Sequence, residues 1–170
     1  MEKKVALIIG AGDSLGSSVA RVFAKDGYII VAARRNGSEL DKLKKEIESK
    51  NGECHTFSLD ARKEEDVIKF IETIEQHVGP ISVAVYNIGA NIKYNILETT
   101  SRKYFKVWEM AAFGAFLVGR EVAKHMVPRK EGTIIFTGAT ASIRGKEGFA
   151  AFSGAKHAKR ALAQSMAREL

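Results

Sequence analysis

Residues 4–18, KVALIIGAGDSLGSS, run from an apolar segment through a glycine-rich turn into the start of an amphipathic helix. The apolar segment is short and rich in β-branched side chains, which predicts a buried strand. Gly10, Gly12 and Gly16 follow it, close to the spacing G-x-G-x-x-G, although Leu15 stands where the third glycine of that pattern would be. A strand, a glycine turn and a helix in this order predict the first βαβ unit of an α/β domain.

Four more apolar runs follow, and amphipathic helical patterns separate them. The five expected strands are residues 4–10, 28–34, 53–59, 81–87 and 132–138. A longer helix is expected from about Ser101 to the residue before Pro128. This alternation predicts right-handed crossovers and a parallel sheet, hence a doubly wound, Rossmann-like α/β fold with three αβα layers. We expect residues 1–170 to form one domain whose C-terminal part is missing, because a further strand should follow the helix that reaches Leu170.

The composition argues against several other classes of protein. The formal net charge is +7, but acids alternate with lysines in Ser38–Lys50, so we expect solvated helix surfaces and no nucleic-acid partner. The single cysteine, Cys54, excludes an internal disulfide and a zinc site of several thiolates, and no metal site is expected. The apolar run Met110–Gly119 is about half as long as a membrane span. We expect a cytoplasmic protein that binds no membrane.

The glycine turn is expected to bind the pyrophosphate of a dinucleotide. Glycines let the main chain approach the anion, and the next helix offers its free N–H groups and the positive end of its dipole. Ser14, Ser17 and Ser18 add hydroxyl donors, and Asp13 must point away from the phosphates. The expected contact residues are Gly10, Gly12, Asp13, Ser14, Leu15 and Gly16. A tight turn without a ligand is the simpler alternative.

The end of the second expected strand favours a phosphorylated cofactor. An NAD site usually has an acid here that accepts hydrogen bonds from the ribose hydroxyls. Ala33 stands at that place, and Arg34 and Arg35 follow it. Arginine offers a planar fork of donors to a 2′-phosphate. We therefore expect NADP(H), with NADPH preferred over NADH; the alternative is a pair of solvated arginines.

Four segments, in order and at suitable spacings, give the chain a resemblance to the short-chain dehydrogenase/reductase family over essentially its whole length. They are GAGDSLG at 10–16, LDA at 59–61, YNIGA at 86–90 and FSGAK at 152–156. The resemblance implies that Asp60, with Ala61, contacts the adenine and that Asn87 and Gly89 lie in the segment after the fourth strand. It also implies that Lys156 binds the nicotinamide ribose.

The same resemblance identifies three departures at the catalytic positions. The family uses a tyrosine, a lysine, a serine and an asparagine, but only Lys156 stands in register here. Phe152, Ala139 and Ala111 occupy the other three places. Phe152 keeps an aromatic ring but has no proton to give, and one positioned acid–base group typically contributes about 10²–10⁴-fold to a rate. The candidate catalytic residues are Lys156 and three replacement donors, Ser142, Thr140 and Tyr94.

Two functions remain open. One is an NADP(H)-dependent oxidoreductase with a non-standard or weakened centre, acting on a carbonyl or alcohol of unknown identity. The other is a catalytically inactive cofactor-binding module used for sensing or assembly. The missing donors favour the second, and the many working enzymes on this scaffold favour the first by analogy. The resemblance further implies that the long helix and the final helix pack against other subunits, giving a dimer or tetramer.

Overall fold

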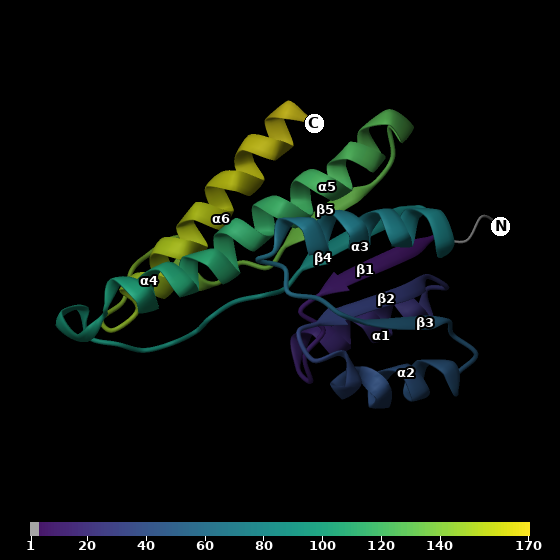
Figure 1. Cartoon of the computed structure of the whole chain (residues 1–170), viewed down its shortest axis with the longest axis horizontal. Helices are drawn as coiled ribbons and strands as arrows, with labels where there is room; N and C mark the ends of the chain where they lie inside the picture. The colour runs from purple at the N-terminus through teal and green to yellow at the C-terminus, as the bar shows by residue number, and fades with distance from the viewer. Residues whose placement is uncertain (1–3) are drawn as a thin grey trace.

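The computed structural model describes residues 4–170 and contains a five-stranded parallel sheet with helices on both faces (Figure 1). The strands are β1 (Val5–Ile9), β2 (Ile29–Arg34), β3 (Cys54–Ser58), β4 (Ile81–Tyr86) and β5 (Thr133–Phe136). Their order is β3-β2-β1-β4-β5, so the direction of winding reverses between β1 and β4. Each strand lies inside its expected run, and the doubly wound Rossmann-like fold is confirmed. Ligands on such sheets bind outside the carboxyl ends of the strands, at the point of reversal.

Residues 4–170 contain six α-helices. They are α1 (Leu15–Lys25), α2 (Asp41–Glu48), α3 (Glu64–His77), α4 (Ser101–Trp108), α5 (Gly114–Arg129) and α6 (Ala150–Glu169). Of these, α4 extends beyond the sheet (Figure 1). Alternate residues of β1 face opposite layers, as the pleat of a strand requires. Ala6 and Ile8 pack with α1 and α2, whereas Leu7 and Ile9 pack with α3 and α5. A strand buried on both faces explains why β1 is apolar throughout.

The long helix differs from the expectation at two points. A π-helical segment, Glu109–Phe113, separates α4 from α5. The expected stop before Pro128 is wrong, because α5 includes Pro128 and ends at Arg129. Lys130 then adopts a left-handed conformation with φ 56°, and its N–H donates to the carbonyl of Val127 at 3.0 Å. A proline in the last turn removes one backbone hydrogen bond. The helix nevertheless continues through the proline and ends one residue later.

Helix α6 packs along α4 and the π-helical segment and runs beside α5 (Figure 1). Small side chains allow this close packing, since Ala111 from the π-helical segment, Val107 from α4 and Ala155 from α6 form one buried cluster. The packing places the start of α6 near the carboxyl ends of β4 and β5.

Helix α1 lies very close to the turn that follows β1. A Cβ atom at Gly16 would lie 2.7 Å from Cα of Ala11 and still closer to the carbonyl oxygen of Gly10. Gly10 itself has φ +86°, which favours glycine. At Gly12, in contrast, a Cβ would meet no protein atom within 4 Å. Gly16 is therefore required by packing within the fold, whereas Gly12 is not.

We predict that Gly16→Ala lowers the free energy of unfolding by roughly 1–3 kcal/mol, because the added methyl forces α1 away from the turn. The matched variant Gly12→Ala should change it by no more than about 0.5 kcal/mol. Urea unfolding of the two variants measures both values. Equal stabilities would contradict the proposed role of Gly16.

Candidate functional site

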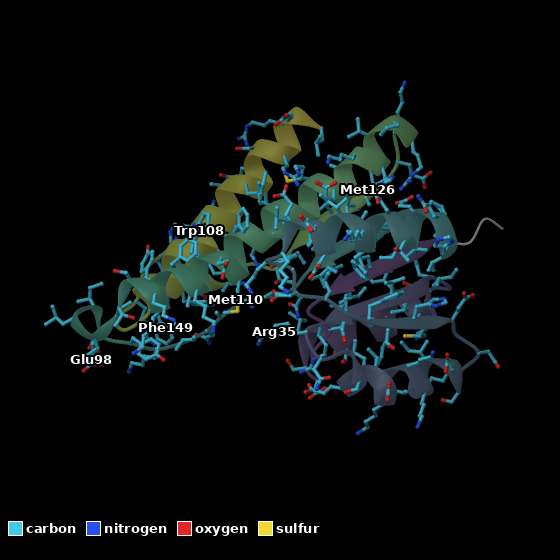
Figure 2. The ribbon with its side chains drawn as sticks, in the orientation of Figure 1. Arg35, Glu98, Trp108, Met110, Met126 and Phe149 are labelled. Atoms are coloured by element: carbon cyan, nitrogen blue, oxygen red, sulfur yellow. The ribbon has the colours of Figure 1, made fainter. Side chains whose placement is uncertain are left out.

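A cavity of about 660 Å³ lies at the carboxyl ends of β1, β2 and β4. This volume is in the range of small-molecule and cofactor sites. Eight of the residues expected to bind a cofactor line it: Gly10, Gly12, Arg34, Arg35, Asp60, Ala61, Asn87 and Gly89. Met110 of the π-helical segment lines it too, and Figure 2 shows Met110 close to Arg35, although the two come from distant parts of the chain. The fold therefore brings these eight residues together, whereas the expected contact residues 13–16 do not line the cavity.

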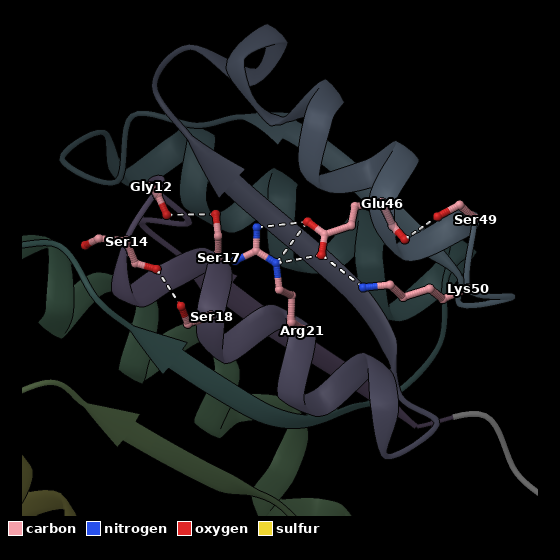
Figure 3. A network of polar contacts seen from close by, with 8 residues as sticks. All are labelled: Gly12, Ser14, Ser17, Ser18, Arg21, Glu46, Ser49 and Lys50. Atoms are coloured by element: carbon pink, nitrogen blue, oxygen red, sulfur yellow. Dashed lines mark hydrogen bonds and ion pairs between the residues drawn. The ribbon is translucent and has the colours of Figure 1, made fainter.

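The hydrogen bonds around the glycine turn correct one expectation (Figure 3). Ser17 Oγ donates to the carbonyl of Gly12 at 2.8 Å, and Ser18 Oγ donates to the carbonyl of Ser14 at 3.0 Å. The hydroxyls of Ser17 and Ser18 thus stabilise the turn and were wrongly expected to face a phosphate. Helix α1 begins at Leu15 with no side-chain cap and no acid in its first turn. Its first N–H groups are the donors that remain for an anion.

Arg34 lies between two carboxylates. Its Nη2 pairs with Glu39, and its Nη1 lies 3.6 Å from Asp13, whose own side chain is 93% exposed. At that distance Nη1 has no hydrogen-bond partner, although the atom is buried. Arg34 therefore lines the cavity and has one donor that is ion-paired with Asp13 but not hydrogen-bonded. Glu39, which lines the same cavity, was not predicted from the sequence.

Asp60 is held in place by Arg62. The guanidinium donates to its carboxylate at 2.8 and 2.6 Å, and these hydrogen bonds lower the pKa of Asp60 below its ordinary value. Arg62 also approaches Glu109 of the π-helical segment at 3.5 Å. Asp60 is therefore a fixed, ionised acceptor at one end of the cavity, with Ala61 beside it.

Asn87 joins β4 to the glycine turn. Its main-chain N–H donates to Ile9 at 2.8 Å, and its Nδ2 donates to the carbonyl of Gly10 at 3.1 Å. The residue thus supports the same turn that α1 contacts. Gly89 follows two residues later and lines the cavity with its backbone.

Lys156 is buried directly behind Gly89, with only 5% of its surface exposed. Its Nζ donates to the carbonyl of Thr137 at 2.9 Å and lies 5.6 Å from the centre of the Phe152 ring. A Cβ placed on Gly89 would lie 3.5 Å from the same Nζ. Burial lowers the pKa of Lys156. The structure thus places Lys156 beside the expected cofactor cavity and beneath the ring that replaces tyrosine.

A second lysine, Lys159, was not predicted, and it lies one turn further along α6. It is 2% exposed, and its Nζ donates to the carbonyl of Ile88 at 3.2 Å and lies 5.3 Å from the centre of the Tyr86 ring. Burial, and then the charge of Lys156, lower the pKa of Lys159 to about 7. Residues three apart on a helix lie near one face, but Arg160, four residues after Lys156, is exposed. The spacing alone therefore did not distinguish Lys159 from a surface lysine.

A smaller cavity of about 330 Å³ lies beside Phe152. Ala139, at the serine position of the resembled family, and Ser153 line it as well, together with the cations Arg144 and Lys146. Ala111, at the asparagine position, is fully buried in the π-helical segment.

The three expected replacement donors lie in different places. Thr140 lines the smaller cavity. Ser142 is buried behind it, and its Oγ accepts a hydrogen bond from the N–H of Ala139 at 3.1 Å. Tyr94 lines neither cavity, and its ring lies under Lys103, whose Nζ is 3.9 Å from the ring centre. The structure therefore brings Thr140 to the smaller cavity and leaves Tyr94 away from both.

Cys54 and the possible metal ligands are two further features of residues 4–170. Cys54 is buried, and burial raises the pKa of its thiol to about 11. Between residues 4 and 170 no three His, Cys, Asp or Glu side chains gather as a metal would require. Over the same residues, no helix has both the length and the apolar character for crossing a membrane.

Two known proteins illustrate the relationship of this chain to others. A short-chain dehydrogenase from Rhodopseudomonas palustris has 50% sequence identity and a TM-score of 0.94, covering 99% of this chain and 78% of its own. Gluconate 5-dehydrogenase of Gluconobacter oxydans is 27% identical over 164 residues, which are 96% of this chain and 64% of that protein. The chain spans less than two thirds of the length of such curated relatives.

Solved structures with this fold hold either nicotinamide dinucleotide. Actinorhodin polyketide ketoreductase with NADPH is 25% identical, with a TM-score of 0.94 over 99% of this chain and 67% of its own. NAD⁺-bound xylitol dehydrogenase is 27% identical, with a TM-score of 0.94 over 99% of this chain and 65% of its own. The fold of these structures thus holds NADPH in one case and NAD⁺ in the other. They do not decide which of the two cofactors this chain prefers.

The share of the chain that one family model matches identifies its family. The model of the short chain dehydrogenases matches residues 4–170, which is nearly the whole chain. The glycine turn, the segment after β4 and the lysine of α6 lie within that match and meet at one edge of the sheet. The chain belongs to the short-chain dehydrogenase/reductase family.

Proposed function

We propose that this chain binds a nicotinamide dinucleotide in the larger cavity and belongs to an oxidoreductase that acts on a carbonyl or an alcohol. The observation that carries the proposal is the open space at Gly12, in front of the uncapped N-terminus of α1. A backbone with no Cβ there, next to free helix N–H groups, suits a pyrophosphate. The family match and the cofactor-bound neighbours support the same assignment.

The residues present fit such a cofactor along its whole length. Gly12 and the start of α1 would hold the pyrophosphate, and Asp60 would lie at the adenine end. Lys156, behind Gly89, would hold the nicotinamide ribose with its ammonium group. The cofactor supplies hydride chemistry when bound, and the chain supplies binding and orientation.

We further propose that NADPH is preferred over NADH. Arg34 has a buried Nη1 without a hydrogen-bond partner, and Arg35 lines the same cavity. A 2′-phosphate would supply the missing acceptor. Glu39 opposes this, because its carboxylate already pairs with Arg34 and would repel a phosphate. The balance between Arg34 and Glu39 then sets the size of the preference.

We predict that the protein binds NADPH at least about tenfold more tightly than NADH, the value of one charge-assisted hydrogen bond. Arg34→Ala should remove most of this difference. Glu39→Gln should increase it, because the competing carboxylate is lost. Calorimetric titrations at low and high salt measure each affinity, and the preference should weaken with salt. Equal affinities of the unmodified protein for both cofactors would refute the preference.

The smaller cavity is the proposed substrate site. Phe152 and Ala139 line it and offer neither a proton nor a donor to a substrate oxygen, while Thr140 offers a hydroxyl. Its charged lining residues, Arg144 and Lys146, are both cations, which favours an acidic substrate. We therefore propose a weakened catalytic centre, and a purely cofactor-binding module is the alternative.

We predict slow reduction of simple ketones by the unmodified protein. Phe152→Tyr combined with Ala139→Ser should raise NADPH oxidation at least tenfold above either single change, because such groups act as a unit. Steady-state assays with a keto acid and its neutral ester as paired substrates measure this. Turnover of a simple ketone at about 10 s⁻¹ by the unmodified protein, a median enzyme rate, would show that the centre is not weakened. No activity in the double variant would favour the binding module.

We also propose that the protein forms a dimer or tetramer through the exposed face of α4 and α5. Phe105, Trp108, Phe113 and Phe116 stack in a ladder, with neighbouring ring centres 6.1–6.2 Å apart. Phe105 is 59% exposed and Phe116 39% exposed. A row of half-exposed aromatic rings is typical of an interaction surface.

We predict that Phe116→Glu dissociates the assembly, because a charge at a closed apolar interface lacks a partner. Leu97→Glu is the matched control, since Leu97 is also exposed and apolar but lies outside the ladder. Sedimentation velocity at micromolar concentration measures the mass of each species. An unmodified protein that sediments as a monomer would exclude this interface.

A further inference from the structure

Lys156 and Lys159 form a pair of buried amines without an anion. Each donates to a backbone carbonyl, Lys156 to Thr137 and Lys159 to Ile88. Among residues 4–170 neither lysine pairs with a carboxylate, and each acts on the charge of the other. Two ammonium groups carry only donors, so they can hydrogen-bond to each other only when one of them is a neutral amine.

The elements packed around the pair provide no compensating charge. The Tyr86 ring faces Lys159 from β4, but its hydroxyl donates to the carbonyl of Met110 at 2.6 Å, and burial raises its pKa. The Tyr104 hydroxyl from α4 lies against Gly154, one turn before the pair.

The carboxylates of the neighbouring helices are paired elsewhere. Glu109 of the π-helical segment approaches Arg62, and Glu121 of α5 is held by Arg120 and Lys124. Burying two uncompensated positive charges side by side is costly. The surroundings therefore favour a pair with a single positive charge, in which one lysine is an ammonium group and the other is a neutral amine.

The pair lies behind the chain segment that lines both cavities. Gly89 and Ala90 line the larger cavity, and Asn91, the next residue, lines the smaller one. Lys156 Nζ lies close to both Gly89 and the Phe152 ring. It is thus an ionisable group beside the ring that lacks a hydroxyl.

We infer that Lys159 is a positioning residue that acts through Lys156, so that the pair shares one proton when empty and takes up a second when an anionic dinucleotide binds. The inference rests on the proposed function. When both lysines are protonated, Lys156 can give a proton to the bound ligand. An N–H bond of Lys156 then breaks, and an O–H bond forms on a ligand oxygen that has gained negative charge. Lys156 is left as a neutral amine, which accepts a hydrogen bond from the Lys159 ammonium. The pair thereby supplies the proton that Phe152 lacks.

The first experiment follows the lysine amines of the cofactor-free protein by NMR, with ¹³C at the lysine Cε atoms. One lysine should titrate near neutral pH. Lys159→Met should remove this step, and Lys156→Met should move it upward by about one pH unit or more, because a like charge has gone. Lys42→Met, on an exposed turn of α2, is the matched control and should leave it unchanged. If every lysine titrates above about pH 9, or if Lys156→Met leaves the step in place, the inference is wrong.

The second experiment has a decisive arm that uses the unmodified protein alone. Calorimetry of NADPH binding at pH 7.5, in two buffers of different ionisation enthalpy, counts the protons taken up. The unmodified protein should take up a substantial fraction of one proton. The Lys159→Met variant should bind NADPH with almost no proton uptake. Binding without proton uptake by the unmodified protein would overturn the inference and leave the proposed function intact. Failure of NADPH to bind would overturn the proposed function, whereas the NMR titration would still decide whether the lysines share a proton.

Discussion

The contact between Gly16 and the backbone of Gly10 and Ala11 fixes the position of the site. Because α1 starts against the end of β1, its N-terminus points to the carboxyl edge of the sheet, where the larger cavity lies. Asn87 supports the same turn from β4 through its hydrogen bond to Gly10. Any side chain at Gly16 would push the helix away from the turn. The proposed anion-binding end of the site thus depends on one close backbone approach.

Polar side chains lie beneath the apolar residues at the expected catalytic positions. Phe152 and Ala111 stand where the resembled family has a phenol and an amide, and both are apolar. One layer deeper, Tyr86 donates to the backbone of the π-helical segment, and Lys159 donates to the segment after β4. Lys156 donates to the carbonyl of Thr137 and lies beneath the Phe152 ring. This arrangement keeps a proton-bearing group beside the larger cavity although Phe152 has no phenol.

The sequence allowed the fold to be predicted because β1, β4 and β5 are uncharged runs rich in β-branched residues and β2 is charged only at its last residue, and each strand lies within its expected limits. The hydroxyl of Ser17 was misjudged, since a donor close to a free backbone carbonyl bonds to it locally. Lys159 stands in the basic stretch KHAKRA and resembles a surface lysine until the direction of α6 is known. Glu39 reaches the cavity only because the turn Gly37–Leu40 folds over the end of β2. Such long-range placement leaves no pattern in neighbouring residues.

The central claim is that one edge of this sheet holds a dinucleotide with its ribose end against the lysine pair. A crystal structure of the protein with NADPH tests it most directly. The account predicts density for the pyrophosphate over Gly12 and the start of α1, and for the nicotinamide ribose within hydrogen-bonding distance of Lys156, next to Phe152. Density for the dinucleotide elsewhere on the molecule, or an empty cavity at saturating NADPH, would contradict it.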